Sequence, residues 1–354
     1  MTLEVTNEAS STRPDLSNRD FALDIQDFKV YYDTPRGIVK AVDGVSLAIR
    51  QGERFALVGE SGSGKSTLAM AVMRLTRPPG RIAGGNVLLH GTDLVSISEE
   101  EMRQTRLADI ALVPQGAMNS LNPVMKISNQ VIDGIIDHIP EGAPKPDADE
   151  LENRVNELLV RVGLAPMVGQ LYPHELSGGM KQRVAMAIAI SLSPRVIIAD
   201  EPTSALDVIV QRQIMQTLGQ LQEGLDAAVL LVGHDMGLVA QFADTVGVMY
   251  AGKLVEIAPV ETIFSNPLHA YPQLLIESIP TMDERKPLTG IPGLQPSLLN
   301  LPEGDVFAPR SPIPHTPEDA ATVPKLVEVE PGHWVQLSRS SVADFNTYAH
   351  LVDY

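Results

Sequence analysis

The chain has 354 residues, which is enough for one large domain with an appendage or for two medium-sized domains. Hydrophobic residues make up 44% of it, so a sizeable core can be buried, and the formal net charge of −17 disfavours nucleic acid as the main partner because phosphate backbones bind basic surfaces. There are no cysteines, which excludes disulfides, zinc–thiolate sites and iron–sulfur clusters.

Residues 1–20 are rich in Ser, Thr, Asn and Asp, which predicts a flexible N-terminal tail. They contain no apolar core of signal-peptide length, and no stretch of the chain approaches the roughly 18 apolar residues that span a bilayer. We therefore expect a soluble chain that reaches a membrane only through a partner.

The first predicted strands contain alternating apolar residues, at Leu23 and Ile25 and again at 45–49. The continuous apolar run 55–58 is typical of a strand that is buried on both faces. An aromatic residue in a strand is usually part of the core, but Tyr32 could also stack on an adenine ring.

A glycine-rich loop follows the run 55–58, and residues 67–73 read as a helix. The loop, GESGSGKS at 59–66, fits the phosphate-loop pattern, which arises by chance in about one per cent of chains. The strand before it and the helix after it favour nucleotide binding, with Lys65 on the phosphates and the Ser66 hydroxyl on Mg²⁺. The predicted phosphate-binding residues are Gly59, Ser61, Gly62, Gly64, Lys65, Ser66 and Thr67.

A helical subdomain is predicted at about residues 118–190. Before it, Ser98 and Glu101 form a capping-box pattern that opens a short acidic helix, and Gln115 could reach Mg²⁺ and water as a neutral ligand. Apolar residues between 151 and 162 fall on one helical face, which Gly163 ends.

A second glycine motif, Ser177-Gly178-Gly179, precedes a good helix. A serine and two bare backbone amides at a helix start can bind an anion, although a plain serine cap with a glycine turn is the commoner meaning of this pattern alone. One chain cannot easily place two phosphate-binding loops on the same phosphates. We therefore expect this motif to act on the nucleotide of a second protomer.

Two further apolar runs, 196–199 and 229–232, predict buried strands with polar residues at their ends. Asp200 would hold Mg²⁺ and Glu201 would polarise the attacking water, although such a pair at a strand end is more often simply solvated. Asp207 is expected at a dimer seam. His234 could sense the γ-phosphate by a hydrogen bond, whereas a lone histidine is more often structural.

Strands alternating with helices predict an α/β fold with a parallel sheet, whose ligands lie at the carboxyl ends of the strands. Residues 246–250 and 254–257 are expected to form a hairpin. Ten prolines between Pro280 and Pro324 predict an extended, irregular segment beyond it.

Taken in this order, the motifs resemble those of the ATP-binding cassette (ABC) ATPases over residues 21–265. The resemblance implies a P-loop ABC nucleotide-binding domain, with a parallel-sheet RecA-like core, an antiparallel β subdomain and a helical signature subdomain. It also implies that two such domains sandwich two ATPs head to tail, with Ser177, Gly178 and Gly179 facing the other protomer's nucleotide. ATP and Mg²⁺ are the expected cofactors.

Six further segments resemble the dipeptide/oligopeptide/nickel import subfamily, and extend the resemblance to about residue 337. The segments are 114–124 (PQGAMNSLNPV), 174–183 (HELSGGMKQR), 207–211 (DVIVQ), 250–256 (YAGKLVE), 266–272 (NPLHAYP) and 304–310 (GDVFAPR). This implies a chain that lies on the cytoplasmic face of the cell membrane and powers an importer of peptides, oligosaccharides or nickel. The implied partners are a second, paralogous ABC ATPase, two transmembrane permease subunits and an extracytoplasmic solute-binding protein, with no nucleic acid.

The extension at 266–354 departs from that subfamily, whose members often carry cysteines there that hold an iron–sulfur cluster. The matching places read Asp305, Ser311, a residue near Glu318 and about Gln336, so no cluster is expected. Phe307 and Trp334 are candidates to hold the extension by packing.

Two other function classes stay open at this level. One is a soluble ABC ATPase of DNA repair or translation, and the other is the ATPase of an exporter whose membrane subunits are separate chains. The transported substrate is not readable from these residues.

Overall fold

The computed structural model describes residues 21–116, 120–279 and 290–352, so the predicted tail at 1–20 and part of segment 114–124 lie outside the described residues. The strands of the described part are β1 (Phe21–Thr34), β2 (Gly37–Arg50), β3 (Arg54–Val58), β4 (Gly80–Leu89), β5 (Thr92–Asp93), β6 (Ile110–Val113), β7 (Val196–Asp200), β8 (Ala228–Val232), β9 (Thr245–Tyr250), β10 (Lys253–Pro259), β11 (Lys325–Glu330) and β12 (His333–Leu337). The α-helices are α1 (Lys65–Val72), α2 (Glu99–Ala108), α3 (Ile127–Ile136), α4 (Ala148–Arg161), α5 (Gly178–Ala189), α6 (Val208–Leu225), α7 (Met236–Phe242), α8 (Val260–Ser265), α9 (Ala270–Glu277), α10 (Pro317–Ala321) and α11 (Phe345–Tyr348).

The strands form two sheets. The smaller sheet is antiparallel in the order β2-β1-β4-β5. The larger sheet has the order β11-β12-β10-β9-β3-β8-β7-β6, in which β9, β3, β8, β7 and β6 are parallel neighbours. The predicted parallel α/β fold is confirmed, and β9 and β10 form the predicted antiparallel hairpin.

The larger sheet is covered on both faces. On β3, Ala56 and Val58 belong to a core shared with α6 and α7, whereas Phe55 and Leu57 belong to a core shared with α1 and the smaller sheet. Because alternate side chains of a strand point to opposite faces, this explains why the run 55–58 is apolar throughout.

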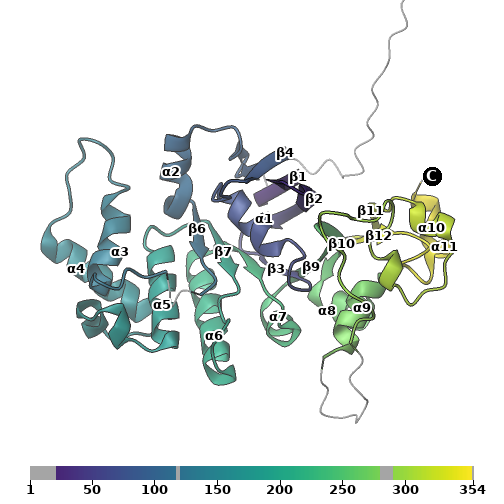
Figure 1. Ribbon diagram of the computed structural model, residues 1–354. Coiled ribbons are helices and arrows are strands. Elements are labelled where there is room, and N and C mark those ends of the chain that lie inside the picture. Colours follow the sequence, from purple (N-terminus) through teal and green to yellow (C-terminus); the bar gives the residue numbers. More distant parts are fainter. Residues whose placement is uncertain (1–20, 117–119, 280–289, 353–354) are drawn as a thin grey trace, which may run out of the picture.

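Two regions adjoin opposite edges of the larger sheet (Figure 1). They are the helical region, which contains α3, α4 and α5, and the C-terminal region, which begins at residue 266. In the first, α3, α4 and α5 pack together, and α5 contacts the edge strand β6. Helix α4 opens with a capping box between Asp147 and Glu150, which was not predicted. Gly163 follows its last turn, as the sequence predicted, and has a φ of 74°.

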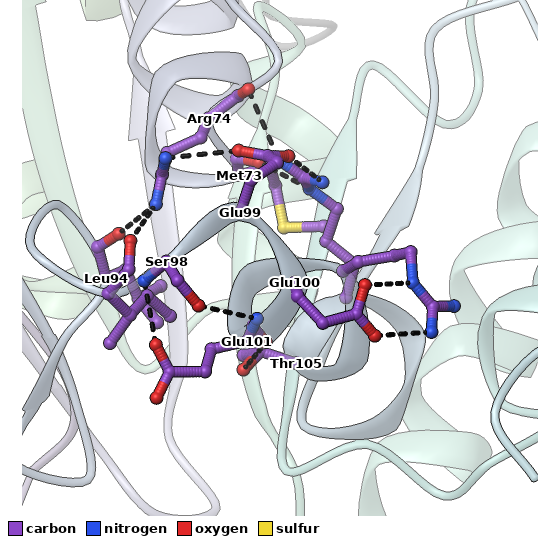
Figure 2. A network of polar contacts seen from close by, with 11 residues as sticks. Met73, Arg74, Leu94, Ser98, Glu99, Glu100, Glu101 and Thr105 are labelled. Atoms are coloured by element: carbon purple, nitrogen blue, oxygen red, sulfur yellow. Dashed lines mark hydrogen bonds and ion pairs between the residues drawn. The ribbon is translucent and has the colours of Figure 1, made fainter. Parts of the chain in front are cut away.

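Helix α2 is attached to the end of α1 (Figure 2). The capping box predicted there is present: Glu101 N–H donates to the Ser98 hydroxyl at 3.2 Å, and Ser98 N–H donates to the Glu101 carboxylate at 2.8 Å. Arg74, just after α1, donates to the Ile97 carbonyl at 2.7 Å and pairs with Glu99 at 3.1 Å. These contacts fix the far end of the helix that begins at the glycine-rich loop.

The C-terminal region extends the larger sheet, since β12 pairs with β10 through Glu256–Val335 and Ile257–Trp334. Phe307 is fully buried and meets Tyr250 edge to face at 5.2 Å between ring centroids, which confirms its packing role, whereas Trp334 is half-buried. The start of the proline-rich segment, 280–289, lies outside the described residues. From residue 290 on the segment is mostly irregular, but α10 interrupts it because Thr316 caps the helix and a proline is tolerated in the first turn.

In the part of the chain that the structure describes, no helix combines the length and the apolar character needed to cross a bilayer.

Candidate functional site

The predicted site residues follow four adjacent strands of the larger sheet. The glycine-rich loop follows β3, and His234 follows β8. Asp200 is the last residue of β7, Glu201 comes directly after it, and Gln115 follows β6. Because these strands are parallel, their carboxyl ends meet at one edge, where an open α/β sheet binds its ligands.

The glycine-rich loop needs glycine at two places for steric reasons. Gly59 has a φ of 145°, and a Cβ there would lie 2.1 Å from the Met249 carbonyl oxygen. Gly64 has a φ of 103°, and a Cβ there would lie 2.1 Å from the Ala41 carbonyl oxygen. The loop therefore runs close against neighbouring backbone, with no room for side chains at these positions.

Lys65 is buried inside this loop. Its Nζ donates to the Gly59 and Glu60 carbonyls at 2.8 Å each and to the Ser63 hydroxyl at 3.2 Å. Burial lowers the pKa of Lys65, against the carboxylates around it. Helix α1 starts at Lys65 after Gly64, which supplies no side-chain cap, so an ammonium and a helix N-terminus converge where an anion is favoured.

Ser66 and Asp200 face each other across the loop and β7. The Ser66 hydroxyl donates to the Asp200 carboxylate at 2.8 Å, and Asp200 is only 4% exposed. Burial raises the pKa of Asp200, although the Ser66 hydroxyl acts in the opposite direction. A hydroxyl and a carboxylate are oxygen ligands of the kind that Mg²⁺ prefers, so these residues fit the ion that the sequence predicts.

Glu201 lies between Gln115 and His234. The Gln115 amide donates to the Glu201 carboxylate at 2.8 Å, and His234 Nδ1 lies 3.5 Å from the other carboxylate oxygen. Glu201 has a φ of 43°, a left-handed conformation that is rare for a non-glycine residue. A cavity of about 160 Å³ is lined by Glu201 and His234 together with the start of α7.

The other predicted site residues lie elsewhere. Ser177 caps α5 by accepting from Met180 N–H at 3.3 Å, and Asp207 caps α6 by accepting from Val210 N–H at 3.0 Å. The simple capping role is therefore present at both, and Ser177 is carried by the helical region rather than by the loop after β3. Tyr32 is half-buried on β1, between Val39 on β2 and Gly80 on β4. Their roles toward a nucleotide stay predictions.

Three residues at this edge were missed by sequence reasoning. Glu60 lies inside the loop, and its carboxylate pairs with Arg310. The backbone N–H of Glu60 donates to the Tyr271 hydroxyl. Glu60 and Arg310 are 250 positions apart, so no local pattern links them.

Comparisons with known proteins identify the family of this chain. Residues 42–204 match the model described as "ABC transporter", and residues 255–315 match that described as "Oligopeptide/dipeptide transporter, C-terminal region". The chain is 43% identical over 296 residues to the Bacillus subtilis "Oligopeptide transport ATP-binding protein OppD", over 82% of this chain and 81% of that protein. The chain belongs to the ABC transporter family. As an ABC ATPase it binds and hydrolyses ATP.

Further relatives agree. The Lactococcus lactis "Dipeptide transport ATP-binding protein DppD" is 40% identical over 317 residues, which are 89% of each chain. Among solved structures, the post-hydrolysis dimer of the ATP-binding cassette MJ0796 bound to ADP and Pi is 28% identical to this ABC ATPase, with a TM-score of 0.60. That match covers 67% of this chain and 98% of the other.

Proposed function

We propose that this ABC ATPase is the energy-coupling subunit of a multi-subunit importer of peptides or related solutes. The observation that carries the proposal is the Glu201 carboxylate, held between Gln115 and His234 beside the phosphate loop, in a chain whose C-terminal region matches that of peptide transporters. The relatives named for oligopeptide and dipeptide transport support peptides as the substrate. Oligosaccharides and nickel are the related solutes that the proposal includes.

In this proposal each residue at the strand edge has one task. Lys65 and the amides of residues 59–67 bind the β- and γ-phosphates. Glu201 accepts a proton from the attacking water, a role that raises the rate of hydrolysis by about 10²–10⁴-fold. His234 senses the γ-phosphate, and Tyr32 stacks on the adenine. Ser66, Asp200 and Gln115 would hold Mg²⁺, which supplies charge neutralisation on the phosphates.

A second ABC ATPase completes the site. Ser177, Gly178 and Gly179 would contact the nucleotide of that partner, and Asp207 would lie at the seam between the two. The dimeric state of the cassette MJ0796 supports a two-cassette arrangement. The partner is proposed to be a paralogous chain, and two permease subunits and a solute-binding protein complete the importer at the cytoplasmic face of the membrane.

The permease is proposed to dock a short helix between the Gln115 region and the helical region. Val124, which precedes α3, and Met167, in the segment 166–170 that contacts α3 and α4, are 79% and 70% exposed although both are apolar. Crosslinks between the permease and Val124 would support this position. Crosslinks to the β9–β10 hairpin instead would contradict it.

The test of the proposed assembly is a mild-detergent affinity purification of the tagged full-length chain from native membranes, read by mass spectrometry. Two multi-spanning proteins and a second ABC ATPase are expected, and a co-purifying solute-binding protein would name the substrate class. Recovery from the soluble fraction alone, without membrane proteins, would contradict the importer and favour a soluble ABC ATPase.

A further inference from the structure

Glu60 joins the phosphate loop to the C-terminal region. Arg310 donates to the two oxygens of the Glu60 carboxylate, with Nη1 at 2.6 Å and Nη2 at 3.1 Å. The Tyr271 hydroxyl accepts from Glu60 N–H at 2.8 Å. A two-pronged guanidinium–carboxylate contact fixes direction as well as distance, which a single contact does not.

Arg310 is itself held rigidly. Its side chain is 4% exposed, its Nε donates to the Pro292 carbonyl at 2.7 Å, and its guanidinium lies 5.7 Å from the Tyr250 ring centroid. Tyr250 packs against Tyr271 and Phe307, with ring centroids 4.7 Å and 5.2 Å away. The arginine therefore presents a fixed fork to the loop rather than a mobile surface charge.

The contact acts on the residue that also holds Lys65. The Glu60 carbonyl accepts from Lys65 Nζ at 2.8 Å and from Ser63 N–H at 3.2 Å. Movement of the Glu60 side chain would thus move the backbone that bonds to the phosphate-binding lysine.

The charges give the contact a purpose. A carboxylate within a loop that binds a polyphosphate opposes binding by repulsion, unless a cation neutralises it and fixes its direction. Glu60 belongs to the phosphate loop and its side chain is 29% exposed, and Arg310 is the buried cation paired with it.

A second contact joins the same two regions. The side chain of Gln295 lies 3.6 Å from the place where a Cβ of Gly62 would stand. Nearby, Lys40 N–H, on β2, donates to the Leu298 carbonyl at 3.2 Å. Residues 292–298 therefore lie along the phosphate loop and the start of β2.

We propose that Arg310 is a positioning residue for nucleotide binding: it neutralises Glu60 and fixes its direction, so that the C-terminal region sets the affinity of the phosphate loop for ATP. This rests on the proposed role of residues 59–67 in binding the phosphates. It gives the cysteine-free C-terminal region a task in the ATPase cycle beyond contact with other subunits.

The test is titration of the full-length chain with a fluorescent ATP analogue in Mg²⁺, comparing wild type with R310Q. The control is R339Q, which removes an arginine of the same region that is 55% exposed and contacts Asn346 instead of the loop. We expect the Kd to rise about tenfold in R310Q, the order expected for one uncompensated unit charge near the phosphates, and to stay unchanged in R339Q.

The double variant E60Q/R310Q separates positioning from general damage to the fold. Because it also removes the repelling carboxylate, its Kd is expected to return to within about threefold of wild type. A Kd for R310Q equal to that of R339Q would overturn the inference, and so would a double variant as weak as R310Q. If R310Q does not fold, R310M replaces it, because methionine keeps an unbranched side chain but removes the charge: a rise in Kd that E60Q reverses supports the inference, and an unchanged Kd overturns it.

The wild-type titration also keeps this inference distinct from the proposed function. Failure of the wild-type chain to bind the analogue would contradict the assigned nucleotide site itself. Tight binding by wild type, with no effect of R310Q, would contradict the role of Arg310 alone.

Discussion

Glu201 carries most of the proposed chemistry among single residues. In E201Q the amide keeps the size of the side chain but cannot accept a proton, so we expect ATP to bind and hydrolysis to fall by about 10²–10⁴-fold. Phosphate release and retained nucleotide are measured together on the purified two-ATPase complex. The control E223Q changes an exposed glutamate on α6 and should hydrolyse normally. Wild-type turnover by E201Q would remove Glu201 from the role of base.

His269 provides a pH-dependent residue in the C-terminal region. Burial lowers its pKa from the ordinary value of 6.5, against the nearby carboxylates of Asp305 and Glu256. The folded chain thus binds this proton less readily than the unfolded chain does. The stabilising contribution is complete above about pH 6.5 and is lost as the pH falls below it.

The variant H269N isolates this titration. Asparagine keeps an acceptor for the Tyr271 N–H and is a favoured helix cap, but it does not titrate. Urea unfolding at several pH values between about 7.5 and 5.5 should show a shallower loss of stability in H269N than in wild type. The exposed His350, changed to Asn, serves as control. Equal slopes in wild type and H269N would contradict the assignment.

At the scale of elements, Ser177 has a structural and a proposed functional role that can be separated. S177A should lose about 1 kcal/mol of unfolding free energy because the cap of α5 is lost, whereas S177N retains a capping oxygen. Both should lower ATP hydrolysis by the purified two-ATPase complex by about 10²-fold if the hydroxyl contacts the partner's nucleotide. Wild-type hydrolysis by S177N would reduce Ser177 to a helix cap.

Elements with a strong local pattern were predictable from the sequence. The run 55–58 predicted β3 because both faces of that strand are buried, and Ser98 and Glu101 marked the start of α2. Strands β11 and β12 were not predicted. Strand β12 pairs with β10, which lies nearly 80 residues earlier, and β11 pairs with β12. Such pairing leaves little trace in segments of five or six residues.

The candidate site shows the same division. The apolar runs placed Asp200, Glu201 and His234 at the ends of buried strands, and a parallel sheet then brings those ends together. Gln115 follows β6, a strand that the sequence analysis did not predict. The pairing of Arg310 with Glu60 could not be found this way. It depends on tertiary packing, in which the Arg310 guanidinium lies against the Tyr250 ring and Tyr250 packs on Tyr271.

At the scale of the whole molecule, the C-terminal region is continuous with the ATPase core. Strand β12 extends the larger sheet. Asp305 stands at one of the places where members of the import subfamily often carry a cysteine, and it accepts hydrogen bonds from the hydroxyls of Ser338, Ser340 and Ser341. The region is therefore ordered by a buried carboxylate and aromatic packing. Its contacts with Glu60 place it beside the phosphate loop.

We expect ATP hydrolysis at this site to drive peptide import. The most direct test is uptake of a labelled peptide by cells that lack this chain, complemented with wild type or with E201Q at equal levels of assembled complex. Wild type should restore uptake and E201Q should not. Uptake that persists without the chain, or that E201Q restores, would contradict the account.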